Sequence, residues 1–291
     1  LEKNPSDEGK LIIRTTGGTR WKVTCAGEHS EETLVSIQRI IDYVNLNSDM
    51  LSDKKVYEHI REKLDLDSFA RLFIINEMMN EKDTNRLSMF YYYTEADGKL
   101  HAGPVWDCDM SLGNRTRWQG KYYFFNLYDE GPAEWLIQNP EFQQLVRDIM
   151  EKEYKAVENF RRNVSAFYSD IKPSLKMSRT LYGIEDIRER EMVDFGDMDE
   201  NKKYLEEYVN NRSRLIEEVI NDPSGFYRIW IDNNVYWLKK GEKIPAAVYE
   251  QICQSRANLY YVYPGGAAFD PEKEINSDLV LGGVAEESVG E

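Results

Sequence analysis

The sequence is poor in the residues that build most redox and zinc sites. It holds only three cysteines and three histidines, at positions far apart: Cys25, Cys108, Cys253, His29, His59 and His101. No Cys-x-x-Cys pair occurs, so neither a zinc knuckle nor a disulfide framework is indicated. The histidines show no metal-ligand spacing, and nothing favours a catalytic Cys–His pair.

Long apolar runs and an excess of positive charge are also lacking. No run of about 18 apolar residues occurs, so we expect no membrane span, and no signal peptide is visible. The chain begins with Leu1, and we interpret it as a piece of a longer protein. The net charge of -15 argues against nucleic acid or an anionic membrane as a partner, because both repel an acidic surface. Such a charge suits divalent cations or basic substrates, although solubility alone explains many acidic proteins.

What is present suffices for a packed core, since 41% of the 291 residues are hydrophobic and 12% are aromatic. Residues 10–25 read as two short strands around a Gly-Gly turn. From Ser30 the apolar spacing becomes helical. A second helix is predicted over 68–79, with Asp67 as its N-cap and apolar residues on more than one face.

A polar loop over 80–86 follows, and then a β-hairpin. Residues 88–93 and 100–105 are its predicted strands, and Asp97-Gly98 is its predicted two-residue turn. Most of the remaining chain is predicted to be helical, with helix starts or bodies at Asn139-Pro140 and over 201–220.

We therefore expect an α+β fold that is mostly helical, with a short N-terminal hairpin and a central hairpin. Four segments are predicted: 1–30 as N-terminal strands, 31–224 as the main domain, 225–268 as a small β-rich appendage, and 269–291 as a loose acidic tail.

The central hairpin brings acidic side chains together. If Asp97-Gly98 is its tip, Asp107 lies opposite Ser88 and Asp109 lies opposite Arg86. The loop that holds Asp83 and Asn85 then ends beside the segment that holds Asp107 and Asp109. We expect these side chains to converge at the open end of the hairpin.

Converging carboxylates either take up protons or bind a cation. Asp107 and Asp109 point the same way if the strand continues. Oxygen ligands favour Mg²⁺ or Mn²⁺, and the natural chemistry of such a site is phosphoryl transfer. Trp106 beside Asp107 predicts a partly buried carboxylate, which is costly unless it is paired or metal-bound. The alternative is an exposed acidic loop without a metal.

The amino-acid sequence of this region resembles that of the CotH (spore coat protein H) kinase family, an atypical protein-kinase-like family. The matching segments are Asn76-Glu77, Asn80 to Asp83, Ser88 to Tyr93, Gly98-Lys99-Leu100, Gly103 to Asp109, Leu112-Gly113-Asn114 and Asn139-Pro140-Glu141-Phe142. The resemblance covers roughly residues 10–220 and implies a protein-kinase-like C-lobe.

The resemblance also implies roles. Asp83 would orient or deprotonate the acceptor hydroxyl, Asp107 would bind the Mg²⁺ or Mn²⁺ that holds the ATP phosphates, and Asp109 would assist. The implied substrate is a Ser/Thr residue of another protein, and the implied location is secreted, cell-surface or on a bacterial spore coat.

Two departures from ordinary kinases stand out. Ser88 occupies the position of the metal-binding Asn, for which nearby Asn85 is a second candidate. The 30 residues before the first helix hold no glycine-rich phosphate loop and no evident strand lysine. We therefore expect little kinase activity from this chain alone.

Two other functions stay open. One is a non-catalytic coat or cell-surface assembly module. It would bind through aromatic residues of the appendage, although such residues are more often core: Tyr227, Trp230, Tyr236, Trp237, Tyr260 and Tyr261. The other is a metal-dependent hydrolase that uses Asp107 and Asp109.

Overall fold

The computed structural model gives a mostly helical α+β fold, as the sequence predicts. It describes residues 2–3, 12–14, 20–22, 30–80, 90–114, 124–125, 136–137, 139–182, 197–231, 234–246, 249, 259–262, 270 and 272–285. The chain divides into two compact units. The first holds residues 1–77, 81–109 and 127–153, and the second holds residues 78–80, 110–126 and 154–291.

The first unit combines helices with two small antiparallel sheets. Its elements are β1 (Glu2–Lys3), β2 (Ile12–Arg14), β3 (Arg20–Lys22), α1 (Glu31–Leu46), a 3₁₀ turn (Ser48–Met50), α2 (Lys54–Lys63), α3 (Leu66–Met79, whose last two residues belong to the second unit), β4 (Tyr91–Thr94), β5 (Lys99–Ala102) and α5 (Pro140–Lys152). The predicted N-terminal hairpin is confirmed, because β2 pairs antiparallel with β3. Strand β1 joins the other edge of β3.

The helices of the first unit start where local capping chemistry places them. The Ser30 hydroxyl accepts the Thr33 amide at 3.1 Å, so α1 begins at Glu31 as predicted. Helix α3 begins at Leu66, and Asp67 lies inside its first turn, where it pairs with Arg71 at 2.6 Å. The predicted Asp67 cap is therefore wrong. The Asp65 carbonyl accepts the first helical bond there, from Phe69.

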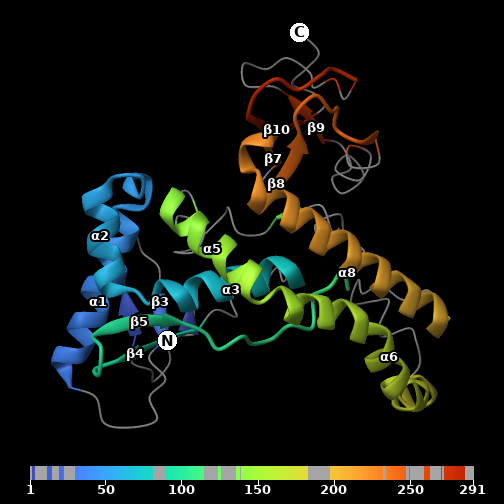
Figure 1. The fold of residues 1–291 in the computed structure, drawn as a ribbon, viewed down its shortest axis with the longest axis horizontal. Coiled ribbons are helices and arrows are strands. Elements are labelled where there is room, and N and C mark those ends of the chain that lie inside the picture. Colours follow the sequence, from blue (N-terminus) through green and yellow to red (C-terminus); the bar gives the residue numbers. More distant parts are fainter. Residues whose placement is uncertain are drawn as a thin grey trace. The chain divides into compact units, whose positions relative to one another are not determined.

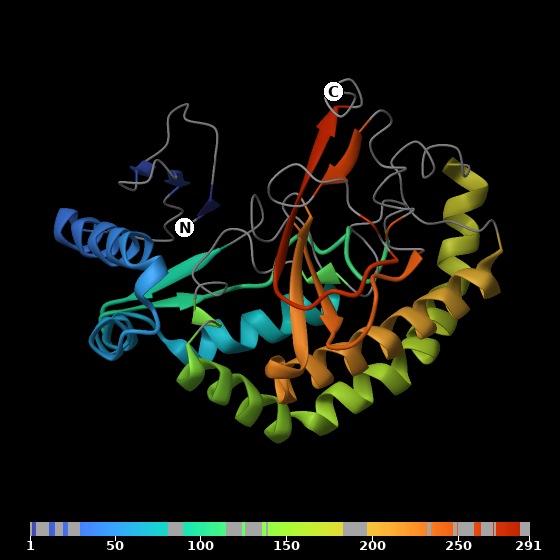
Figure 2. The same cartoon turned by 90° about the horizontal axis from the view of Figure 1, so that it is seen from above.

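Helix α3 is buried on more than one side, as its apolar composition predicts. The buried positions are Phe69, Ala70, Leu72, Phe73, Ile74, Asn76 and Glu77. Hairpin β4–β5, drawn in green in Figure 2, packs its Tyr91 ring against Phe69, with ring centroids 5.3 Å apart. This places the hairpin directly on the helix that leads into the predicted catalytic loop.

The second unit contains two long helices and a five-stranded sheet. Its elements are β6 (Phe124–Phe125), α6 (Tyr154–Tyr182), α8 (Met198–Asn221), a 3₁₀ turn (Pro223–Gly225), β7 (Phe226–Ile231), β8 (Asn234–Lys239), β9 (Leu259–Val262) and β10 (Leu279–Ala285). Helices α6 and α8 run side by side (Figure 1). The predicted helix over 201–220 begins earlier, at Met198, because the Asp197 side chain caps it.

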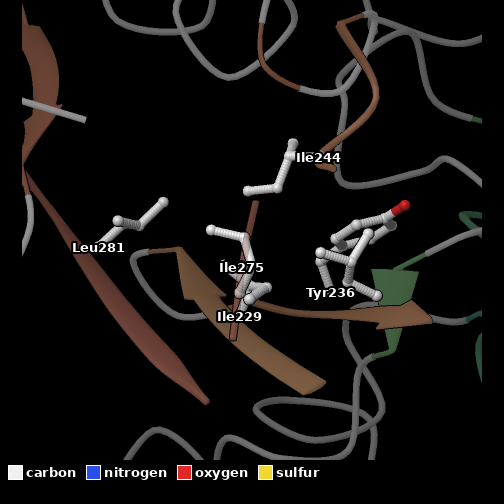
Figure 3. Close-up of a cluster of buried hydrophobic side chains, with 6 residues drawn as sticks. Ile229, Tyr236, Ile244, Ile275 and Leu281 are labelled. Atoms are coloured by element: carbon white, nitrogen blue, oxygen red, sulfur yellow. The ribbon is translucent and has the colours of Figure 1, made fainter. Parts of the chain in front are cut away.

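The sheet order is β6-β8-β7-β10-β9. Hairpin β7–β8 lies in the predicted appendage. Residues 279–285, which we expected in a loose tail, instead form β10 between β7 and β9. A buried cluster of apolar side chains links β10 to β7 and β8 (Figure 3): Ile229, Tyr236, Leu238, Ile244, Ile275 and Leu281. The expectation of a loose tail was therefore wrong for this segment.

Candidate functional site

The β4–β5 hairpin is the base from which the predicted site extends. Its register pairs Thr94 with Lys99 and Tyr91 with Ala102, two residues away from the predicted pairing. The Gly98 amide donates to the Thr94 carbonyl at 3.0 Å, which closes a four-residue loop over 95–98. A type I′ turn needs positive φ at both central residues, and only Gly98 has it, with φ of +68°. The predicted two-residue turn is therefore wrong.

The observed register changes which residues face each other beyond the hairpin. The last bond of the ladder runs from the Gly103 amide to the Phe90 carbonyl at 2.9 Å. Both legs of the chain therefore leave the hairpin at one end, as predicted. Continued in this register, Asp107 falls opposite Arg86 rather than Ser88. Asp83, Asn85 and Ser88 lie outside the described residues, so their convergence with Asp107 and Asp109 stays a prediction.

The strand does not continue to the two aspartates. Strand β5 ends at Ala102, and Gly103 has a φ of +116°. Asp107 then adopts the left-handed conformation, with a φ of +59°. For a residue other than glycine this conformation costs on the order of 1–2 kcal/mol, and Asp tolerates it better than most. Such backbone outliers cluster at functional sites, which makes Asp107 the first candidate of this segment.

Both candidate metal ligands face solvent. Asp107 and Asp109 are exposed, and Trp106 keeps 60% of its surface accessible while its ring meets the edge of Phe90 at a centroid distance of 6.1 Å. The predicted burial of the Asp107 carboxylate is therefore wrong. An exposed carboxylate does not need a metal to offset desolvation, but it is open to a hydrated ion and to a nucleotide.

Asp107 and Asp109 are of the ligand type that a nucleotide-bound magnesium ion takes, and the ion itself stays an expectation. Mg²⁺ keeps several waters and is commonly held by one or two carboxylates together with substrate phosphates. Asp107 and Asp109 supply two such carboxylates. Within the described ranges, no group of three or more His, Cys, Asp or Glu side chains is placed to hold a metal ion.

The hairpin tip carries a separate charged network. His101 lies between two carboxylates, with Nδ1 at 3.0 Å from Asp65 and Nε2 at 2.9 Å from Asp97, and it stacks on the Tyr92 ring. Desolvation raises the pKa of Asp97, but hydrogen bonds from the Lys99 amide and from His101 outweigh it, so the pKa is lowered overall. This network fastens the tip of the hairpin to the junction between α2 and α3.

The segment after Asp109 enters the second unit, where Met79 and two tyrosines of α8 hold it, and the sequence had not indicated these tyrosines as part of the site. The Leu112 amide donates to the Met79 carbonyl at 2.6 Å, and the Tyr204 hydroxyl donates to the Gly113 carbonyl at 3.0 Å. Buried Asn80 donates through Nδ2 to the Tyr208 hydroxyl at 2.6 Å. Tyr204 and Tyr208 are four residues apart on α8, and this spacing could have indicated from the sequence that they share one face of the helix.

Asn139 has a structural role in the segment Asn139-Pro140-Glu141-Phe142, one of the segments that resemble the CotH kinase family. Its Oδ1 accepts the Glu141 and Phe142 amides at 2.8 and 3.3 Å, and its Nδ2 donates to the Leu51 carbonyl at 2.6 Å. One buried side chain thus starts α5 and ties it to the turn before α2. This confirms the predicted helix start.

The family comparison agrees with the residues that define this region. A family model described as CotH kinase protein matches residues 21–216, more than half of the chain. The match spans Asp83, Asp107 and Asp109 as well as the two tyrosines of α8. No curated protein matches the chain.

Proposed function

The chain belongs to the CotH kinase protein family, and we propose that it is an atypical protein kinase that transfers the γ-phosphoryl group of ATP to Ser or Thr residues of another protein. Family membership supports the reaction class. The observation that carries the proposal for this chain is the placement of Asp107, in a left-handed backbone and exposed to solvent, on one leg of the hairpin whose other leg leads from Asp83.

In this proposal the two carboxylate groups have different tasks. Asp107, with help from Asp109, would hold Mg²⁺ or Mn²⁺, which supplies charge neutralisation for the β- and γ-phosphates. Asp83 would accept the proton of the acceptor hydroxyl as its oxygen bonds to the γ-phosphorus and the bond from that phosphorus to the bridging oxygen of ADP breaks. Asn85 or Ser88 would provide a further oxygen ligand.

The exposure of Asp107 and Asp109 supports an entry path for a large, charged ligand. A nucleotide with its ion can approach these carboxylates without opening a core. The acidic net charge of -15 attracts the ion and suits a basic acceptor protein.

The assembly-module alternative loses part of its basis. Tyr236 and Trp237, two of the aromatics proposed to bind a partner, keep only 6% and 7% of their surface accessible. They are core residues of the five-stranded sheet, as the more common behaviour of such aromatics predicts. The hydrolase alternative uses the same aspartates and would differ in transferring the phosphoryl group to water.

Calorimetric titration with Mn²⁺, in the presence of ATP, tests the proposal. Wild type is expected to bind the ion, and Asp107→Asn is expected to bind it about tenfold more weakly or worse, because a charged ligand is lost. Asp170→Asn is the matched control, since Asp170 is an exposed carboxylate on α6. Equal binding by all three proteins, or no binding by wild type, would refute the metal site.

Detection of the transferred phosphate then separates the candidate reactions. Labelled phosphate on Ser or Thr, even at the low level expected from this chain alone, indicates a kinase, and release of inorganic phosphate without labelled protein indicates a hydrolase. Absence of both, in a protein that does not bind Mn²⁺, would favour the assembly module.

A further inference from the structure

Two tyrosines of α8 contact two segments that are far apart in the sequence. Tyr204 donates to the Gly113 carbonyl at 3.0 Å, and Tyr208 accepts from Asn80 Nδ2 at 2.6 Å. They are spaced four residues apart on the helix, and their ring centroids lie 6.2 Å apart. One face of α8 therefore forms hydrogen bonds both to the end of α3 and to the loop that follows Asp109.

Both contacts of α8 are closely packed. Tyr208 keeps 3% of its surface accessible and Asn80 keeps 1%. The ring of Tyr208 lies so close to Gly113 that an added Cβ would sit 2.4 Å from its Cδ2 atom. The Leu112 amide meets the Met79 carbonyl at 2.6 Å, so the two segments are also bonded directly to each other.

Backbone geometry shows that these segments are held in specific conformations. Asn80, Leu112 and Gly113 all have positive φ, at 52°, 53° and 76°. Positive φ at Asn80 and Leu112 persists only where the surroundings determine it. The bonds to Met79, Tyr204 and Tyr208 provide that determination.

The two segments that α8 contacts are close in the sequence to the candidate site residues. Asn80 precedes Asp83 by three residues, and Gly113 follows Asp109 by four residues. We propose that Tyr204 and Tyr208 are positioning residues that hold the chain after Asp109 against the end of α3, so that Asp107 and Asp109, the proposed metal ligands, keep one arrangement. This inference rests on the proposed function, because it assigns the tyrosines a task at that site.

The chemistry of the tyrosines suits this task. Their hydroxyls bond to the Gly113 carbonyl and the Asn80 side-chain amide, so we propose a structural task for them and no contact with the nucleotide. Burial raises the pKa of Tyr204, so its hydroxyl stays protonated and able to donate at neutral and moderately alkaline pH. A site whose ligands are held in advance binds more tightly, since less ordering is required on binding.

Single-atom deletions test the inference. Tyr204→Phe and Tyr208→Phe keep the rings and remove only the hydroxyls, and Tyr182→Phe, at a residue with 73% of its surface accessible, is the matched control. Hydrogen exchange of the peptide that spans 103–114 reports how firmly the loop is held. The Mn²⁺ dissociation constant, measured by electron paramagnetic resonance in the presence of ATP, reports the site.

We expect both α8 variants to speed exchange in 103–114 and to raise the Mn²⁺ dissociation constant by about 3- to 10-fold, while Tyr182→Phe changes neither. Far-UV circular dichroism should stay at the wild-type level. Unchanged exchange in both variants, or faster exchange with an Mn²⁺ dissociation constant within about twofold of wild type, would overturn the inference. If wild type itself fails to bind Mn²⁺, the proposed function fails and the positioning role fails with it, whereas the exchange data still show whether the tyrosines hold the loop.

Discussion

Replacing Gly113 by alanine would place a methyl group against the ring of Tyr208 and the hydroxyl of Tyr204. The added Cβ would lie 2.4 and 2.5 Å from ring carbons of Tyr208 and 2.8 Å from the Tyr204 hydroxyl. The φ of +76° costs alanine about 1–2 kcal/mol, and overpacking of a buried contact costs about 1–3 kcal/mol. We therefore expect a loss of about 2–5 kcal/mol in the free energy of unfolding.

Urea unfolding followed by circular dichroism measures this loss, with Gly241→Ala as the control. Gly241 has a φ of +81°, and an added Cβ there would meet nothing within 4 Å, so its replacement carries only the backbone cost. In a Tyr208→Ala background the cost of Gly113→Ala should fall toward that of the control, because the clashing ring is gone and only the Tyr204 hydroxyl remains close. If Gly113→Ala costs no more than Gly241→Ala, or if the two substitutions at 113 and 208 are additive, the packing described for this loop is refuted.

Three further predictions concern stability. Asn139→Ala should cost about 2–4 kcal/mol in urea unfolding, since it removes a helix cap and leaves a buried carbonyl without its donor; a cost below about 0.5 kcal/mol would contradict this. Leu281→Ala should cost about 2–5 kcal/mol while its exposed neighbour Val280→Ala costs less than about 1 kcal/mol, and equal costs would mean that β10 is not held in the sheet. The lowered pKa of Asp97 stabilises the fold above the ordinary carboxyl pKa of about 3.9, and this contribution is lost as the pH falls through the lowered value. Urea midpoints from pH 2 to 7 should thus show a smaller acid-side loss for Asp97→Asn than for wild type, and parallel curves would exclude the network at the hairpin tip.

Local chemistry made part of the fold predictable from the sequence. Ser30 and Asn139 cap their helices through bonds to amides two or three residues away, so the helix starts follow from short segments alone. The start of α3 did not, because the helix begins at Leu66, one residue before Asp67, and Asp67 pairs with Arg71 instead of capping the helix.

Non-local pairing accounts for the larger errors. Residues 279–285 include Gly282 and Gly283 and read as a tail, yet they pair in parallel with β7 and antiparallel with β9. The register of β4–β5 depended on whether Asp97 takes positive φ, which composition alone does not decide. The placement of the site at the open end of the hairpin stays a prediction. Asp107 is exposed and has a left-handed backbone, and Trp106 beside it indicated neither property.

Asp107 and Asp83 are proposed to have different tasks, and one titration distinguishes the two tasks. Mn²⁺ binding in the presence of ATP should be followed by electron paramagnetic resonance for wild type, Asp107→Asn and Asp83→Asn. If Asp107 holds the ion and Asp83 serves the acceptor hydroxyl, Asp107→Asn raises the dissociation constant by about tenfold or more, and Asp83→Asn changes it by less than about threefold. Unchanged affinity in Asp107→Asn, or an equal loss in both variants, would contradict the account.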